Sequence, residues 1–205
     1  KLTGGFMAKL SPNDFSSELP IRWCPGCGDF AILIAVKKAM AEIGMEHERY
    51  VVVSGIGCSS RFPYYVNIYG YHTIHGRAIP IATGIRLSNP ELMVFVVTGD
   101  GDALSIGGNH LIHAIRRNIG LKVLMFNNRI YALTKGQASP TTLFGSKTKT
   151  SPSGNFDYPF NPVSLAVNLG APFVARCIDV DVNMITSVIV EAAKNEGFAF
   201  VEILQ

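Results

Sequence analysis

Two groups of oxygen-bearing side chains follow two strand-like stretches of this sequence. Met93 to Val97 is a continuous apolar run rich in β-branched residues, which is typical of a strand buried on both faces of a parallel sheet. The run ends at Thr98-Gly99-Asp100-Gly101, where the glycines allow a tight turn and Asp100 offers a carboxylate. A second apolar run, Val123 to Phe126, ends on Asn127-Asn128. Because open α/β sheets bind ligands at the carboxyl ends of their strands, both ends are candidate ligand sites.

The side chains at these positions have the chemistry of magnesium ligands. Mg²⁺ is a hard cation that proteins usually hold through one or two oxygen ligands together with phosphate oxygens. Asp100 and an Asn side chain can supply such oxygens, and the implied ligand is a diphosphate. The alternative is a sheet turn that happens to carry an acid, and a lone Gly-Asp-Gly motif would favour it. The paired asparagines and the two strand-like runs favour the cofactor site.

A second group of candidate ligands consists of cysteines. Cys24-Pro25-Gly26-Cys27 is a compact turn ahead of a helical pattern, and Cys58 follows the apolar run Tyr50 to Val53. A CxxC motif alone fits a redox dithiol, half a zinc site or half an iron–sulfur site. Zinc normally needs a second ligand pair, and the sequence has no second CxxC motif and no spaced pair of histidines. Only Cys177 remains, far downstream.

Four motifs together resemble the β subunit of 2-oxoacid:ferredoxin oxidoreductases, and the similarity is collinear over nearly the whole chain. Gly101 and Asn127 have 25 residues between them, which matches the GDG-x-NN signature of thiamine-diphosphate enzymes. The motifs are CPGCGD at 24–29, GIGCSSR at 55–61, GDG at 99–101 and NN at 127–128.

The resemblance implies two sets of ligands on this chain. It implies that Asp100, the Asn128 side chain and the Ile130 carbonyl hold Mg²⁺. It also implies that the thiolates of Cys24, Cys27 and Cys58 hold a [4Fe-4S] cluster beside thiamine diphosphate. The residues expected to bind the cofactor are Ile56, Gly57, Cys58, Ser59, Gly99, Asp100, Gly101, Asp102, Asn128, Ile130, Ala132 and Leu133.

A [4Fe-4S] cluster needs a fourth ligand. The family's fourth ligand follows the last apolar strand, which is predicted here at Phe198 to Leu204. The missing ligand is therefore expected just beyond Gln205, with Cys177 as the alternative. Unpaired cysteines are often buried as small apolar residues, so a core position is the competing interpretation of Cys177.

Three further residues are expected to act on the substrate. Arg61 could reach an anion from the Gly-rich turn before it. His75 lies in a His-Gly-Arg-Ala motif that the family places at the cofactor or substrate, where it could stabilise negative charge on a substrate carboxylate or an enolate-like intermediate. A structural histidine is the alternative. Lys135 could pair with the distal carboxylate of 2-oxoglutarate, where pyruvate offers only a methyl group, or it could be a solvated loop lysine.

The loop that carries Lys135 bears on the substrate. Residues 131–140 read YALTKGQASP and resemble the form found in 2-oxoglutarate-type members of the family rather than in pyruvate enzymes. Ala132 replaces the usual glycine, which could narrow backbone freedom beside the diphosphate.

A parallel sheet is needed to bring these residues together. We predict an α/β fold of the thiamine-diphosphate-binding type, with a mostly parallel sheet and helices on both faces. The polar stretch 129–140 is predicted to be a loop, and 141–162 a mobile segment that orders over the site or a partner. The predicted strands are 50–53, 93–97, 123–126, 173–175 and 198–204, and the predicted helices are 30–43, 163–169 and 184–195, with helix-like segments near 81–85 and 111–115.

Composition sets the wider limits. A chain of 205 residues with 48% hydrophobic residues can form one domain, and we predict a single domain over 1–205 with an extended lead-in at 1–22. Only 16% of residues are charged and no run reaches the roughly 18 apolar residues of a membrane span, so the surface is expected to make subunit contacts. A net charge of +3 with scattered basic residues argues against nucleic acid as a partner. The opening residues lack a signal-peptide pattern, so a cytoplasmic location is expected.

The resemblance also implies a reaction. It is the oxidative decarboxylation of 2-oxoglutarate or a related 2-oxo acid to an acyl-CoA and CO₂, with electrons passed to ferredoxin through the cluster. No obvious carboxylate for activating the cofactor is found, so the site is expected to be shared with an α subunit, in an αβ or (αβ)₂ enzyme. The alternatives are a pyruvate-type or broad-specificity member, a non-redox thiamine-diphosphate decarboxylase or synthase, and a zinc-stabilised interaction subunit.

Overall fold

A parallel sheet carries the other elements of this chain. The computed structural model describes residues 10–205. Six strands lie in the order β2-β1-β3-β4-β8-β7, and every neighbouring pair is parallel. The prediction of a mostly parallel sheet is confirmed. The strands are β1 (Tyr50–Ser54), β2 (Tyr69–His72), β3 (Met93–Gly99), β4 (Leu121–Asn127), β7 (Phe173–Ile178) and β8 (Ala199–Leu204).

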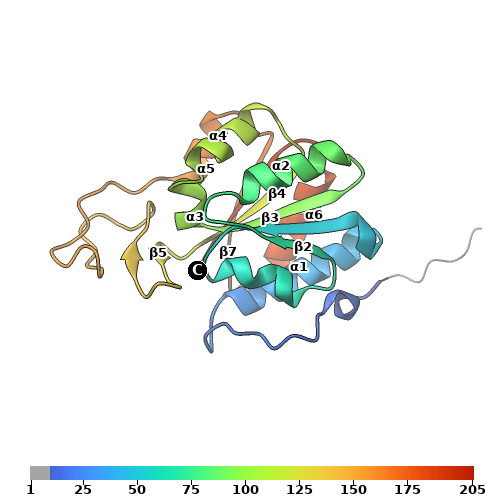
Figure 1. Ribbon diagram of the computed structural model, residues 1–205, viewed down its shortest axis with the longest axis horizontal. Coiled ribbons are helices and arrows are strands. Elements are labelled where there is room, and N and C mark those ends of the chain that lie inside the picture. Colours follow the sequence, from blue (N-terminus) through green and yellow to red (C-terminus); the bar gives the residue numbers. More distant parts are fainter. Residues whose placement is uncertain (1–9) are drawn as a thin grey trace, which may run out of the picture.

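Helices cover both faces of the sheet, as predicted. In Figure 1, α2, α4 and α5 lie above the sheet and α1 lies below it. Contacts between α1 and α6 place α6 on the same face as α1. The helices are α1 (Asp29–Ile43), α2 (Ala78–Ser88), α3 (Asp100–Leu104), α4 (Gly108–Arg116), α5 (Pro162–Asn168) and α6 (Val182–Lys194), and the 3-10 helices are η1 (Pro12–Phe15), η2 (His47–Arg49) and η3 (Ser59–Tyr65).

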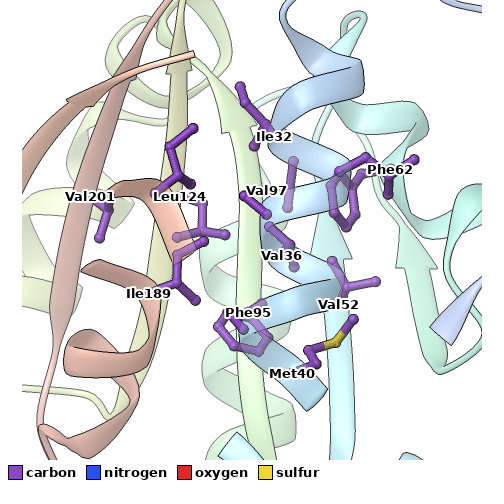
Figure 2. Close-up of a cluster of buried hydrophobic side chains, with 14 of the residues drawn as sticks. Ile32, Val36, Met40, Val52, Phe62, Phe95, Val97, Leu124, Ile189 and Val201 are labelled. Atoms are coloured by element: carbon purple, nitrogen blue, oxygen red, sulfur yellow. The ribbon is translucent and has the colours of Figure 1, made fainter. Parts of the chain in front are cut away.

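The apolar runs of the sequence become the middle of this three-layer structure. Figure 2 shows Ile32, Val36 and Met40 on α1 facing Phe95 and Val97 on β3. Successive strand residues point to opposite faces, so a strand covered on both sides needs apolar residues at every position. Burying one such side chain contributes about 1.5–3 kcal/mol. The sheet is thereby a rigid support for the loops at its carboxyl edge.

The strand register sets which loops meet at that edge. Gly99 at the end of β3 is paired with Phe126, next to the end of β4. Ser54 at the end of β1 is paired with Val97. The turns that follow β1, β3 and β4 therefore start side by side, although they are far apart in the sequence.

Several elements differ from the sequence prediction. Residues 69–72, where no strand was predicted, form the edge strand β2, and all of its residues are exposed. The stretch after Asn128 is not wholly a loop, since β5 (Ile130–Tyr131) and β6 (Gln137–Ala138) form an antiparallel ribbon. The chain can reverse direction between β5 and β6 because Lys135 and Gly136 both have positive φ, at 72° and 105°.

The lead-in also differs from the prediction. Residues 1–9 lie outside the described part of the chain. Residues 12–15 form η1 rather than an extended segment, and Phe15 is fully buried in the chain's own core. The ring of Phe15 packs edge-on against Tyr50 at a centroid distance of 5.6 Å. The described part of the lead-in therefore packs on this chain.

Residues 141–162 follow one defined path that projects from the sheet edge (Figure 1). The side chain of Asn155 donates to the carbonyls of Thr142 and Asp157, at 3.0 and 3.2 Å. Gly145 and Ser146 exchange backbone hydrogen bonds with Asn155. The segment begins beside Asp100, so its base belongs to the site.

Candidate active site

A cavity of about 390 Å³ opens at the carboxyl edge of the sheet. The turns that follow β1, β3 and β4 form much of its wall, and the Cys24–Cys27 turn before α1 completes it. Every residue that the sequence analysis selected for a site role contributes to this wall. They are Cys24, Cys27, Ile56, Gly57, Cys58, Ser59, Arg61, His75, Gly99, Asp100, Gly101, Asp102, Asn128, Ile130, Ala132, Leu133 and Lys135.

Asp100 begins α3 and is only 1% exposed. Its Oδ2 accepts hydrogen bonds from the hydroxyls of Ser139 and Thr141, each at 2.5 Å. Burial raises the pKa of this carboxyl, and the two hydroxyls oppose that rise. The carboxylate is therefore held in one orientation at the cavity wall.

The two asparagines after β4 have different surroundings. Asn127 is buried, its Nδ2 donates to Glu202 at 2.6 Å, and its Oδ1 accepts from Thr141 at 2.9 Å. Asn128 lines the cavity, and its Oδ1 accepts from the backbone N–H of Ile130 at 3.1 Å. Asn128 is thus the member of the pair that can bind a ligand, while Asn127 helps to fix the position of the Thr141 hydroxyl.

Close packing of Tyr131 explains why the last position of the Gly-Asp-Gly motif, Gly101, is a glycine. A Cβ on Gly101 would lie 2.4 Å from the Tyr131 ring, so a larger residue would displace that ring. The Tyr131 hydroxyl donates to the Gly101 carbonyl at 3.1 Å. This contact joins the turn after β3 to the ribbon after β4.

Three cysteines share the cavity wall and the fourth does not. The pKa of Cys27 is raised to about 11, chiefly by burial and in smaller part by the nearby charges of Asp29, Cys58 and Cys24. Burial likewise raises the pKa of Cys58. Cys177 lies on β7 in the apolar core, 2% exposed, and does not line the cavity. The interpretation of Cys177 as a buried small residue therefore fits the structure.

Arg61 and Lys135 both line the cavity wall. Neither takes part in an ion pair among the described residues, so both cations are free to meet an anion. Lys135 is exposed at the turn between β5 and β6. Ala132 is not among the residues with positive φ, so alanine fits this position without backbone strain. The cavity can thus offer positive charge to a substrate.

Other residues of the wall were missed by the sequence analysis. The indole N–H of Trp23 donates to the Cys58 carbonyl at 2.7 Å, which joins the two cysteine loops. Gln205 Nε2 donates to Asp29 Oδ1 at 2.6 Å. Asp29 Oδ2 has no partner among the described atoms. The place of Asp29 inside the CPGCGD motif could have identified it as a site residue. The direction in which the Gln205 side chain points depends on the tertiary fold and could not be predicted.

Two further findings concern metal binding and membrane spanning. Among residues 10–205, no three His, Cys, Asp or Glu side chains converge as the ligands of a single metal ion do. A cluster does not require this arrangement, because its cysteines bind separate iron atoms. None of the helices in the described part of the chain is long and apolar enough to cross a membrane.

Comparison with known families gives a direct match. Residues 55–203 match the family described as thiamine pyrophosphate enzymes, C-terminal TPP binding domain. The matched region includes the turns after β1, β3 and β4, and the Cys24–Cys27 turn lies before it. The predicted cofactor class is therefore confirmed at the level of the family.

Individual proteins are also similar to this chain. A 2-oxoglutarate oxidoreductase subunit KorB of Mycobacterium tuberculosis is 59% identical over 94% of this chain and 52% of its own length. A 2-oxoglutarate synthase subunit KorB of Archaeoglobus fulgidus is 48% identical over 91% of this chain and 69% of its own length. The chain thus spans about half to two thirds of these relatives.

A solved structure has nearly the same fold. It is a 2-oxoglutarate:ferredoxin oxidoreductase from Magnetococcus marinus with 2-oxoglutarate, coenzyme A and succinyl-CoA bound. The TM-score is 0.95 at 44% sequence identity, over 97% of this chain and 68% of the solved one. The resemblance inferred from the four motifs is confirmed. This chain belongs to the thiamine pyrophosphate-binding β subunits of the 2-oxoacid:ferredoxin oxidoreductase family.

Proposed function

We propose that this chain is the β subunit of an enzyme that oxidatively decarboxylates 2-oxoglutarate to succinyl-CoA and CO₂ and passes the electrons to ferredoxin. The observation that carries the proposal is a single cavity wall that contains Asp100, Asn128 and three cysteines. Its relatives named for 2-oxoglutarate support the choice of substrate. The chain would act as one cofactor-binding domain over residues 1–205.

The magnesium and diphosphate site fits the residues present. Asp100 and Asn128 offer hard oxygen ligands at adjacent strand ends, and the Ile130 carbonyl would complete the protein's contribution. Gly57 has φ of 113°, and a Cβ there would meet nothing within 4 Å, which leaves open space for a ligand against the main chain. Ile56 and Ser59 flank this space. When bound, thiamine diphosphate would supply the reactive carbon and the electron sink that decarboxylation needs.

The cysteine set fits an iron–sulfur cluster. Cys24 and Cys58 help to raise the pKa of Cys27, and Cys24 helps to raise that of Cys58, so the thiols lie near one another. Loading iron would displace the thiol protons. A non-redox thiamine enzyme would have no use for this set. We propose that Cys177 is not the fourth ligand, because its thiol is packed in the core on β7.

The substrate would be held by the cations of the wall. Lys135 would pair with the distal carboxylate of 2-oxoglutarate, and Arg61 would attract another anionic group in the cavity. His75 would stabilise the negative charge that develops on the substrate during the reaction. Gly99, Gly101, Ala132 and Leu133 would shape the space around the cofactor.

A partner subunit would complete the active site. The acids of the cavity wall are Asp29, Asp100 and Asp102, and all three already accept hydrogen bonds from neighbouring groups of this chain. We propose that an α subunit supplies the carboxylate that activates the cofactor, in an αβ or (αβ)₂ enzyme that also takes coenzyme A. The four free cysteines fit a reducing compartment, and we propose the cytoplasm.

Anaerobic purification of the assembled enzyme tests the proposal. We expect bound thiamine diphosphate and magnesium, iron and sulfide on the β subunit, and ferredoxin reduction that requires both 2-oxoglutarate and coenzyme A. Thiamine without iron would indicate a non-redox decarboxylase or synthase. Zinc without thiamine would indicate an interaction subunit. Faster turnover of pyruvate than of 2-oxoglutarate would reassign the substrate.

A further inference from the structure

The carboxylate of Asp102 is buried at the cavity wall, between the turn after β1, the turn before α2 and the end of β3. Its Oδ1 accepts from His75 Nδ1 at 2.8 Å and from the backbone N–H of Gly76 at 2.7 Å. The same oxygen accepts from the backbone N–H of Ile56 at 3.2 Å. Its Oδ2 accepts from the Thr98 hydroxyl at 2.7 Å. Both oxygens are thus occupied by groups of the protein, and the side chain is only 2% exposed.

These contacts argue against a direct role on the cofactor. A carboxylate surrounded by four donors has little capacity left for a metal ion or for taking a proton. The surroundings are also closely fitted, because a Cβ on Gly55 would lie 1.8 Å from Asp102 Oδ2. Asp102 therefore acts through its neighbours, although the sequence analysis placed it among the residues that touch the cofactor.

We propose that Asp102 is the positioning residue for His75, an inference that rests on the function proposed above. An ionised carboxylate only accepts hydrogen bonds, so His75 must carry a proton on Nδ1. The remaining ring nitrogen, Nε2, is then the one available to the cavity that His75 lines. The ring also meets Tyr131 edge-on, with centroids 6.1 Å apart, so it is held on two sides.

The arrangement gives His75 a defined chemistry. A protonated His75 can donate from Nε2 to an oxygen on which negative charge develops, and the buried carboxylate behind it stabilises the positive ring. A 2-oxo acid is a substrate of this kind, since its carbonyl oxygen gains negative charge when a nucleophile adds to the carbonyl carbon, before CO₂ leaves. Asp102 contributes to the reaction without touching the reacting atoms.

A double-mutant cycle in the assembled enzyme tests the inference. Asp102→Asn keeps an oxygen for the three donors at Oδ1 and an amide for the Thr98 hydroxyl, so it removes the charge while filling the same space. We expect kcat for 2-oxoglutarate to fall about 10–100-fold, as for other residues that support a catalytic group, with bound thiamine diphosphate and KM nearly unchanged. In a His75→Gln background, Asp102→Asn should lower kcat by less than about twofold, because the effect of Asp102 passes through His75.

The controls separate this role from a purely structural one. Thr98→Val removes a donor to the same carboxylate but leaves the His75 contact, and we expect kcat within about threefold of the wild type. An equal cost of Asp102→Asn in both backgrounds, or loss of thiamine diphosphate from that variant, would overturn the inference. Full activity of His75→Gln would do the same while leaving the proposed function intact. A loaded wild-type enzyme that reduces no acceptor with 2-oxoglutarate would instead defeat the proposed function.

Discussion

At the scale of single residues, Trp23 connects the two cysteine loops. Its indole N–H bonds to the Cys58 carbonyl, and its ring packs edge-on against Tyr65 at 4.8 Å and Phe30 at 5.7 Å. The indole lies one residue before Cys24. We infer that it holds the loops close to the separation that the cluster needs.

Trp23→Phe should therefore weaken cluster retention. The change keeps an aromatic ring but removes a hydrogen bond worth about 0.5–1.5 kcal/mol, or roughly 2–10-fold in cluster affinity. Iron per chain and the rate at which the cluster absorption bleaches in air measure this effect. Phe30→Leu alters a contact with the same ring but spares the hydrogen bond, and serves as the control. Equal iron content and bleaching rate in Trp23→Phe and wild type would rule the role out.

Asp100→Ala should abolish binding of magnesium and thiamine diphosphate while the chain still folds. The carboxylate is the one acid of the proposed metal set, so its removal takes away the main attraction for the cation. Calorimetric titration with magnesium and the cofactor gives the affinity, and circular dichroism checks the fold. Ser139→Ala removes a single hydrogen bond to Asp100 and should weaken binding far less. Wild-type affinity in Asp100→Ala would refute the metal assignment.

Lys135→Ala should reduce turnover of 2-oxoglutarate far more than turnover of pyruvate. A charged hydrogen bond contributes about 1.5–3 kcal/mol, so kcat/KM for 2-oxoglutarate should fall roughly 10–150-fold. Pyruvate has no distal carboxylate and should be nearly unaffected. Lys147→Ala, on the projecting segment and outside the cavity wall, is the matched control. Equal losses on both substrates would exclude the specificity role.

The sequence located the site residues but could not assign their contacts. Asp100, Asn128 and the three cysteines follow strands or a compact turn, and parallel pairing brings such positions to one edge. The bond from Asp102 to His75 and the turn of Asn127 toward Glu202 depend on side-chain directions set by tertiary packing. Neither leaves a periodic pattern in the sequence.

At the scale of elements, the apolar strands were the easiest to predict and the polar ones the hardest. The helix-like stretch after the Gly-Asp-Gly motif is broken between α3 and α4, because the turn at Gly76 packs into the break. A Cβ on Gly76 would lie 2.5 Å from Ile106 and 2.7 Å from the backbone nitrogen of Gly107. The edge strand β2 reads Tyr-Gly-Tyr-His and has no apolar alternation, so pairing with β1 decides its conformation.

At the amino-terminal ends of the strands, away from the cavity, a buried lysine links the sheet to a helix end. Lys122 on β4 donates to the carbonyls of Asn195 and Gly197, just after α6, which suits the negative end of a helix dipole. Burial, aided by the charge of Arg86, lowers the pKa of Lys122 to about 8. The folded protein thus holds this proton less tightly than the unfolded chain does.

This shift predicts a pH dependence of stability. Between about pH 8 and pH 10.4, the unfolded state binds more protons at Lys122, so this residue's contribution to the free energy of unfolding rises with pH. We expect the stability of wild type relative to Lys122→Met to increase by roughly 1–3 kcal/mol from pH 7.5 to pH 10. Denaturant unfolding at both pH values measures the difference. A difference that stays constant, or one that shrinks, would contradict the assigned cause.

At the scale of the whole molecule, the chain leaves much apolar surface uncovered. The projecting segment exposes Phe144, Phe156, Tyr158 and Phe160, and the Phe144 and Tyr158 rings stack at 5.3 Å. The low share of charged residues had suggested a surface used for subunit contacts, and these aromatic side chains are in keeping with that expectation. The layered architecture was predictable from composition and strand pattern, whereas the path of this segment was not, because it has no periodic pattern.

The strand order has a consequence for how the protein is made. Within the described sheet β7 pairs with β8 alone, and β8 inserts between β4 and β7 although it follows both of them in the chain. Glu202, which orients Asn127, also belongs to β8. A nascent chain on the ribosome therefore cannot close the sheet or fix Asn127 until residues 199–204 have emerged from the exit tunnel. Loading of the proposed metal and cofactor would accordingly wait until β8 has emerged, and a ribosome that stalls before β8 would release a product unable to keep either.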